Sequence, residues 1–222
     1  MVKDEETRLY VIIAGIAALL IFTYNAVFYN MLDLGTRFMD SIFQVVSLIT
    51  STGFRTVDYN LWPTFPKFIL LLLFFVGGCS SSTGGGLKSI RVLVALKLIK
   101  RGVSLKIHPH RIAPLTLNEK ELNTDSVISI SNFIFTYVTI FIAATLLLSI
   151  NGYDLITNAT ASLACLCNVG PGLSMVGPFE SYAFFSGFSK LVCCFLMIAG
   201  RLELFTVLAL FSRNYWKPDS IR

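Results

Sequence analysis

The stretch GGCSSSTGGGLKS, residues Gly77 to Ser89, lies between two runs of bulky apolar residues. The run before it, Phe68 to Val76, is almost entirely Leu and Phe, and the run after it, Leu87 to Ile99, is apolar with Lys and Arg residues set into it. Residues 77–86 contain only Gly, Ser, Thr and Cys. Exposed backbone is tolerated at membrane depth only where it is buried in protein or lines water. The stretch therefore predicts a functional interruption in a membrane-embedded segment.

The composition places the whole chain in a membrane. Of its 222 residues, 55% are hydrophobic and 14% are charged, and the mean hydropathy is +0.71, whereas soluble domains carry about 25% charged residues. A helix needs about 20 largely apolar residues to cross the hydrocarbon core. Leu9 to Leu32 and Ser126 to Tyr153 carry no charge, and both are too long for a cleavable signal peptide. The sequence predicts an all-α integral membrane protein.

The excess of basic residues sets the expected orientation. The net charge is +5, and residues 88–111 contain seven Lys and Arg but no Asp or Glu. Because loops on the cytoplasmic side are enriched in Lys and Arg, we expect this basic segment, and both termini, in the cytoplasm. A basic run can also bind nucleic acid, here through Lys97, Lys100, Arg101 and Lys106. Because membrane segments flank the basic run, a cytoplasmic location explains its charge better than nucleic-acid binding does. No nucleic-acid partner is therefore expected.

The chain divides into two similar units, residues 1–111 and 112–222. Each unit has a span, a helix too short to cross, a polar loop and a second span. Lys67 precedes Gly77 by ten residues and Lys190 precedes Gly200 by ten, which indicates a duplication. The expected segments are Leu9–Leu32, Gly35–Phe54 and Lys67–Ile99 in the first unit, and Ser126–Ile150, Leu155–Leu166 and Gly187–Phe211 in the second.

A short helix that enters the membrane and continues as extended chain is the construction of an ion selectivity filter. The negative end of each helix dipole would point at the membrane centre and favour a cation. Neither polar loop contains a carboxylate, so neutral oxygens would coordinate a monovalent ion. Either loop alone could be an ordinary turn; two in equivalent places favour a filter. The expected backbone ligands are Ser51, Thr52, Gly53, Asn168, Val169 and Gly170, with Pro171 and Gly172 at the exit.

Several motifs together resemble the TrkH branch of the Trk/Ktr/HKT superfamily of potassium uptake proteins. They are STGFRTVDYNLWP, GGCSSSTGGGLKSIRV, IHPHRIAP, CNVGPGLSMVGP and GRLELFTVLALF. That family has four span–pore helix–span repeats, and this chain resembles the third and fourth. The resemblance implies potassium uptake across the cytoplasmic membrane, with potassium as substrate and no bound cofactor. It implies a filter formed by Ser51, Thr52, Gly53, Phe54, Asn168, Val169, Gly170 and Pro171.

The resemblance also implies a gate and partners. The gate is the intramembrane loop, with Arg201 projecting near it; the loop residues are Gly77, Gly78, Cys79, Ser80, Ser81, Ser82, Thr83, Gly84, Gly85 and Gly86. A cytoplasmic nucleotide-binding regulatory ring (TrkA-like) would dock on the basic segment, residues 88–111. The missing first and second repeats, or another copy of the chain in a homodimer, would complete the pore.

Other interpretations of these residues remain open. Small residues also serve close helix packing, although ten in succession exceed that need. A Walker phosphate loop fits Lys88 and Ser89 but lacks two glycines, since Ser82 and Leu87 stand in their places. Arg201 could extend its side chain to the cytoplasmic surface.

The polar residues outside these loops point to no other activity. Glu203, two residues after Arg201, faces elsewhere on a helix and is a poor partner for it. His108 and His110 are expected in a cytoplasmic loop, and no catalytic constellation indicates an enzyme. The alternative function is that of a non-conducting remnant or a partner-binding membrane protein.

Overall fold

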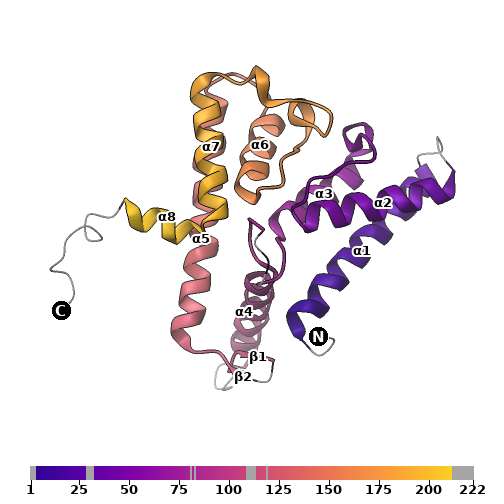
Figure 1. Ribbon diagram of the computed structural model, residues 1–222. Helices are drawn as coiled ribbons and strands as arrows, with labels where there is room; N and C mark the ends of the chain where they lie inside the picture. The colour runs from indigo at the N-terminus through magenta and orange to yellow at the C-terminus, as the bar shows by residue number, and fades with distance from the viewer. Residues whose placement is uncertain are drawn as a thin grey trace.

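The computed structural model describes residues 4–28, 33–80, 82, 84–108, 114–118 and 120–211 of the chain. Among the residues considered above, Ser81, Thr83 and His110 lie outside these ranges. The described part is mostly helical (Figure 1). Three one-turn 3₁₀ helices, η1 (Tyr59–Leu61), η2 (Ser174–Val176) and η3 (Tyr182–Phe184), lie in its loops.

In the part of the chain that the structure describes, two single helices are long and apolar enough to cross a membrane. They are α1 (Glu5–Phe28) and α5 (Thr124–Ser149). The sequence predicted spans from Leu9 and from Ser126, and both helices begin a few residues earlier. The acidic residues Glu5 and Glu6 in the first turn of α1 suit the positive end of its dipole. The prediction of two long apolar helices is confirmed, and both fit a membrane protein.

Two shorter helices, α2 (Leu34–Ile49) and α6 (Leu155–Cys167), match the predicted short helices. Each begins at an aspartate: the Asp33 carboxylate accepts from the Gly35 N–H, and the Asp154 carboxylate accepts from the Thr157 N–H. Partial burial alone would raise the pKa of Asp154, but hydrogen bonds from the Thr157 hydroxyl and N–H lower that pKa below its usual value. At about 20 Å, α6 is shorter than a hydrocarbon core of about 30 Å.

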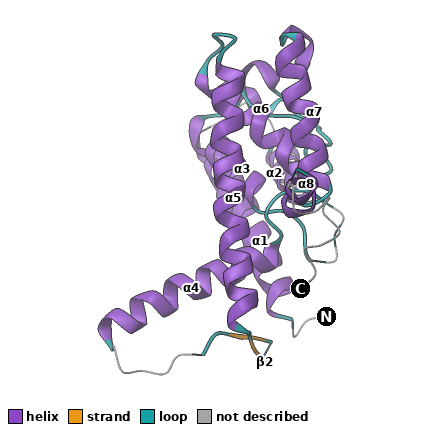
Figure 2. Cartoon of the chain, turned by 90° about the vertical axis from the view of Figure 1, so that its left-hand side faces the viewer, coloured by secondary structure: helices purple, strands orange, loops and turns teal. Residues whose placement is uncertain are grey.

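The glycine-rich loop, residues 77–86, separates α3 (Thr64–Phe75) from α4 (Ser89–Ile107). Val76 and Leu87 form an isolated parallel bridge across the base of the loop, and the Gly77 N–H donates to the Leu87 carbonyl at 2.8 Å. Figure 2 shows α4 leaving the lower part of α5 at a wide angle. The loop therefore separates two distinct helices within the predicted segment Lys67–Ile99. A small hairpin of β1 (Thr116–Leu117) and β2 (Lys120–Glu121) lies near the N-terminal end of α1 (Figure 1).

The last segment differs from its prediction as one continuous span. The structure has α7 (Gly187–Arg201) and α8 (Leu204–Leu210), bent by 114° at the break between them. Glu203 in the break has a φ of +64°, a conformation that interrupts helical hydrogen bonding. Its carboxylate pairs with Lys88 and Arg91 of α4. Arg201 is consequently the last residue of α7 and does not lie within an unbroken helix.

The core forms around α6, which packs against α5, α7 and α3. Almost every residue of α6 from Thr157 to Cys167 is buried. The helix α2 packs against α1 and α3 and buries only one side, which includes Gln44, Val45 and Leu48. Both short helices end near the glycine-rich loop at the middle of the molecule (Figure 1).

Candidate functional site

The first loop, residues 50–54, leaves the end of α2 through two residues with positive φ. Ser51 has a φ of +56° and Gly53 one of +70°. The N–H groups of Thr52 and Gly53 both donate to the Ser47 carbonyl, at 3.0 and 3.2 Å, and the Ser47 hydroxyl donates to the Phe54 carbonyl at 2.5 Å. The donors of this loop thus turn back toward the helix.

The second loop, residues 167–172, repeats this backbone arrangement after α6. Asn168 has a φ of +55° and Gly170 one of +101°, and the Val169 N–H donates to the Ala164 carbonyl at 3.0 Å. In both loops, two residues with positive φ are separated by one residue. Two dissimilar sequences therefore share one local geometry.

The two loops lie against each other. A Cβ atom added to Gly53 would stand 2.1 Å from the Val169 carbonyl oxygen. In the part of the chain that the structure describes, five loop carbonyls accept no hydrogen bond from a protein donor. They belong to Ser51, Thr52, Gly53, Asn168 and Val169. Five free acceptors on adjacent backbone can coordinate a desolvated cation.

The 3₁₀ helices η1 and η3, which follow the first and second loops in the chain, each donate a tyrosine hydrogen bond to the second loop. The hydroxyl of Tyr59 in η1 donates to the Gly172 carbonyl at 3.2 Å, and that of Tyr182 in η3 donates to the Gly170 carbonyl at 2.7 Å. After each turn a lysine, Lys67 or Lys190, donates from Nζ to a carbonyl seven residues earlier, at 3.3 and 2.8 Å. The lysine spacing noted in the sequence thus corresponds to the same contact in both units.

The glycine-rich loop lies directly beside the ends of both short helices. Cβ atoms built on Gly84 and Gly85 would stand 3.5 Å from the Ser51 hydroxyl and 2.7 Å from the Cys167 carbonyl, respectively. A Cβ on Gly200 of α7 would stand 2.0 Å from the Leu166 carbonyl oxygen. The buried amide nitrogen of Asn168 lies between these glycines and has no hydrogen-bond partner among the described residues.

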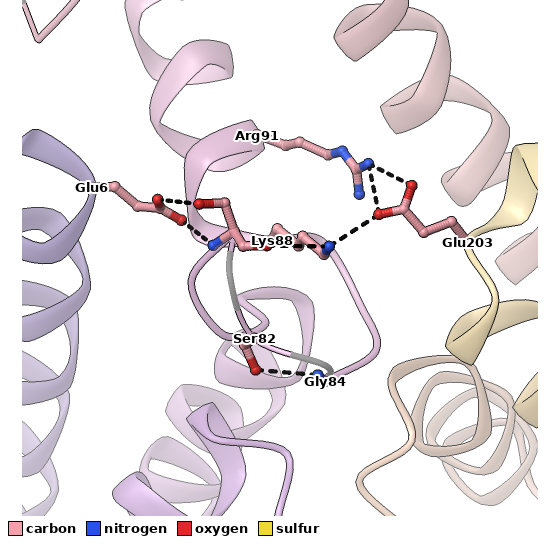
Figure 3. A network of polar contacts seen from close by, with 7 residues as sticks. Glu6, Ser82, Gly84, Lys88, Arg91 and Glu203 are labelled. Atoms are coloured by element: carbon pink, nitrogen blue, oxygen red, sulfur yellow. Dashed lines mark hydrogen bonds and ion pairs between the residues drawn. The ribbon is translucent and has the colours of Figure 1, made fainter.

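A network of ionic contacts holds the glycine-rich loop from two sides (Figure 3). On one side, Glu6 of α1 accepts from the Ser80 N–H at 2.6 Å and from the Ser80 hydroxyl at 2.8 Å. On the other, Lys88 donates to the Ser80 carbonyl at 3.3 Å and pairs with Glu203 at 3.0 Å, while Arg91 pairs with Glu203 at 3.3 Å. The loop is therefore connected to α1 and to the break between α7 and α8.

A cavity of about 50 Å³ borders this network and the glycine-rich loop. Arg201 lines it together with Ser82, Gly84 and Gly86, and also with Lys88, Arg91 and Glu203. Across the described ranges Arg201 forms no ion pair. Three basic groups and one carboxylate leave this cavity with an excess of positive charge, which opposes the passage of a cation.

The sequence did not identify Glu6 and Glu203 as functional residues. Glu203 was set aside because it cannot face Arg201 on one helix, and Glu6 was not considered. Their partners, Lys88 and Ser80, are 115 and 74 positions away. The sequence did contain one signal. A carboxylate beside an apolar membrane segment is energetically costly, so each of these glutamates needs a partner somewhere in the fold.

Comparisons with known proteins agree with the resemblance in the sequence. The family model TrkH, described as a cation transport protein, matches residues 7–218. The chain is 32% identical to the Trk system potassium uptake protein TrkG of Escherichia coli (strain K12) over 98% of its length, and 33% identical to the Trk system potassium uptake protein TrkH of Salmonella typhimurium over 97%.

A solved structure has the same fold. The crystal structure of the potassium transporter TrkH from Vibrio parahaemolyticus covers 97% of this chain with a TM-score of 0.90 and 31% sequence identity. The chain covers 46% of that structure and 44% of each of the two curated relatives. It therefore spans about half the length of the proteins that it matches.

Proposed function

Because this chain belongs to the TrkH family of cation transport proteins, we propose that it forms half of a pathway for potassium uptake across the cytoplasmic membrane. Its relatives carry potassium transport in their names. On this proposal the chain corresponds to the third and fourth repeats of the family, one in residues 1–111 and the other in residues 112–222. Potassium is its substrate.

One observation carries the proposal: two loops of the same backbone geometry lie in contact and leave five carbonyls free. In this function those carbonyls replace the water of a potassium ion, and Phe54, Gly170 and Pro171 border the same path. Each short helix directs the negative end of its dipole toward the ion. The absence of a carboxylate from both loops suits a monovalent cation.

The glycine-rich loop acts as the gate in this proposal. It lies beside the inner ends of both short helices, and Arg201 places a positive charge in the cavity beyond it. The side chain of Ser80 and the ion pairs of Glu203 hold the loop in the closed arrangement. Opening moves the loop and the arginine away from the ion path.

The pore is completed by two further repeats or by another copy of the chain. The support is the outer side of the first loop, where Phe54 is 71% exposed, and of α2, where Met39 is 68% exposed. Such a surface beside free carbonyls is unsuited to lipid, because carbonyls in hydrocarbon need a partner. The basic segment, residues 88–111, lies on the cytoplasmic side with both termini, and the side of it that is turned away from the membrane receives the regulatory nucleotide-binding ring.

Rubidium uptake into vesicles tests the proposal directly. We expect uptake when this chain is reconstituted together with a chain that carries the two complementary repeats, and little uptake by either alone. Uptake absent from the combination, with both chains folded and inserted, would favour a non-conducting remnant.

The filter assignment is tested by substituting a glycine in an open site. A Cβ on Gly170 meets nothing within 4 Å, so we expect Gly170→Ser to fold and to lower the preference for potassium over sodium. Gly152→Ser is the matched control, because Gly152 also has a positive φ, +76°, and open space, but lies in the turn after α5. Equal permeability ratios in the two variants would contradict the assignment.

The gate is tested at Arg201. Replacing it with glutamine removes a positive charge from the cavity, so we expect Arg201→Gln to raise rubidium flux in the reconstituted pore. Lys190→Gln serves as the control, since Lys190 lies at the opposite end of α7. A flux in Arg201→Gln no higher than in the control would count against the gate.

A further inference from the structure

A basic cavity lies away from the ion path, between α4 and the hairpin. It measures about 300 Å³, and Lys97, Lys100, Arg101 and Ser104 of α4 form one wall, while Pro114, Leu115 and Thr116 form the other. The basic residues recur at helical spacing, so they share one side of α4. The cavity is therefore lined by three basic side chains, two hydroxyl groups and two apolar residues.

Two of the three cations are not neutralised. Lys97 pairs with Glu5 of α1 and also donates to the Thr116 carbonyl at 2.7 Å. Lys100 and Arg101 form no ion pair within the described ranges, and the Nε of Arg101 is buried without a hydrogen-bond partner there. Because a buried guanidinium nitrogen without an acceptor is costly, the cavity suits an anion with several oxygen acceptors.

The neighbouring side of α4 carries an exposed apolar stripe. It is formed by Leu96, Ile99, Val103 and Ile107, which are between 50% and 67% exposed. These positions lie on one side of the helix, directly beside Lys100 and Ser104. Since α4 runs at a wide angle to the spanning helix α5 (Figure 2), its axis has the inclination of an amphipathic helix that lies in a membrane surface.

We propose that the cavity between α4 and the hairpin binds the phosphate of an anionic phospholipid, while the apolar stripe of α4 rests in the adjoining acyl region. Charge complementarity selects the phosphate, and the stripe beside it selects a lipid over a free anion. Lys100, Arg101 and the hydroxyls of Ser104 and Thr116 supply the donors. The proposal is independent of the filter and the gate, because lipid binding needs no transport.

Native mass spectrometry of the chain in detergent tests the site. The chain is titrated with phosphatidylglycerol or with phosphatidylcholine, and the bound lipids and copies of the chain are counted. We expect one tightly bound phosphatidylglycerol. Each Lys or Arg near an anionic surface contributes about 1 kcal/mol, a factor of about five, so Lys100→Gln with Arg101→Gln should weaken binding roughly 30-fold.

The control variant is Lys120→Gln, an exposed lysine of β2 outside the cavity, which should bind as the unaltered chain does. Helix content from circular dichroism verifies that the double variant is folded. If it is not, the unaltered chain still provides a test, since its phosphatidylglycerol binding should weaken when salt rises from about 0.1 to 0.5 M.

Three results would overturn the proposal. Equal binding of phosphatidylcholine would show that charge does not select the ligand. Displacement of the lipid by millimolar inorganic phosphate would indicate a site for a free anion. Loss of a dimer in the double variant, with lipid binding unchanged, would assign this side of α4 to a second copy of the chain.

Discussion

The two short helices use the same local construction in different surroundings. Both begin at an aspartate cap and end in a residue of positive φ, Ser51 after α2 and Asn168 after α6. However, α6 is enclosed by other helices of the chain, and its Leu163 is 1% exposed, whereas Met39 on α2 is 68% exposed. Local sequence can specify a helix and its end, while burial depends on what packs around it.

The largest difference between the two loops should come from Gly53 and Gly170, the glycines at the second positive-φ position of each loop. Gly53→Ala places a Cβ at 2.1 Å from the Val169 carbonyl oxygen, at a φ of +70°, while Gly170→Ala meets only the strain of its positive φ. Such strain costs of the order of 1–3 kcal/mol, and Gly53→Ala should exceed this because the loops must separate. Thermal unfolding in detergent measures both, and equal losses would show that the loops do not touch.

A smaller difference in stability is expected between truncating a buried side chain of α6 and truncating an exposed side chain of α2. Leu163→Ala in α6 should lower the free energy of unfolding by about 2–5 kcal/mol, whereas Met39→Ala in α2 should change it by less than about 0.5 kcal/mol. Adding a chain with the complementary repeats should increase the cost of Met39→Ala, because α2 then becomes covered. A cost that stays unchanged on assembly would place the missing contacts elsewhere.

The smallest effect is expected at the helix caps. Asp154→Asn keeps an oxygen that can accept from Thr157 but loses the negative charge at the start of α6, and should cost about 0.3–1 kcal/mol. Asp33→Asn should cost less, since within the described ranges Asp33 accepts only from the Gly35 N–H, at 3.3 Å.

The loss of unfolding free energy caused by Asp154→Asn should depend on pH. Its lowered pKa in the folded chain means that the stabilisation is present above the usual aspartate pKa and is lost as pH falls through the lowered value. Unfolding at pH 7 and at about pH 3 measures this, and a cost of Asp154→Asn that does not shrink in acid would contradict the role of the charge.

Much of the helical framework could be predicted from the sequence. The limits of α6 follow from Asp154 and the residues after Cys167, and α5 matches its apolar run within two residues at its start. Capping, apolar length and glycine content act over a few neighbouring residues, so they can be read directly from the chain. The positions of the first and second loops followed in the same way.

The break after Arg201 could not be predicted. The run from Gly187 to Phe211 is mostly apolar, with Lys190, Arg201 and Glu203 as its charged residues, so its length suggested one span. The bend arises where Glu203 reaches Lys88 and Arg91 of α4. The direction of α4 could not be predicted either. The glycines in residues 77–86 allow many backbone conformations, so the chain can continue from α3 in many directions.

The sequence by itself determined which segments are helices, where the two short helices end and which loops contain no charge, because these properties depend on neighbouring residues. Only the tertiary structure decided that the first and second loops touch, that Glu6 and Glu203 hold the glycine-rich loop from opposite sides, and that the last helix bends. Contacts between residues more than 70 positions apart depend on the packing of whole helices, and no local pattern encodes that packing.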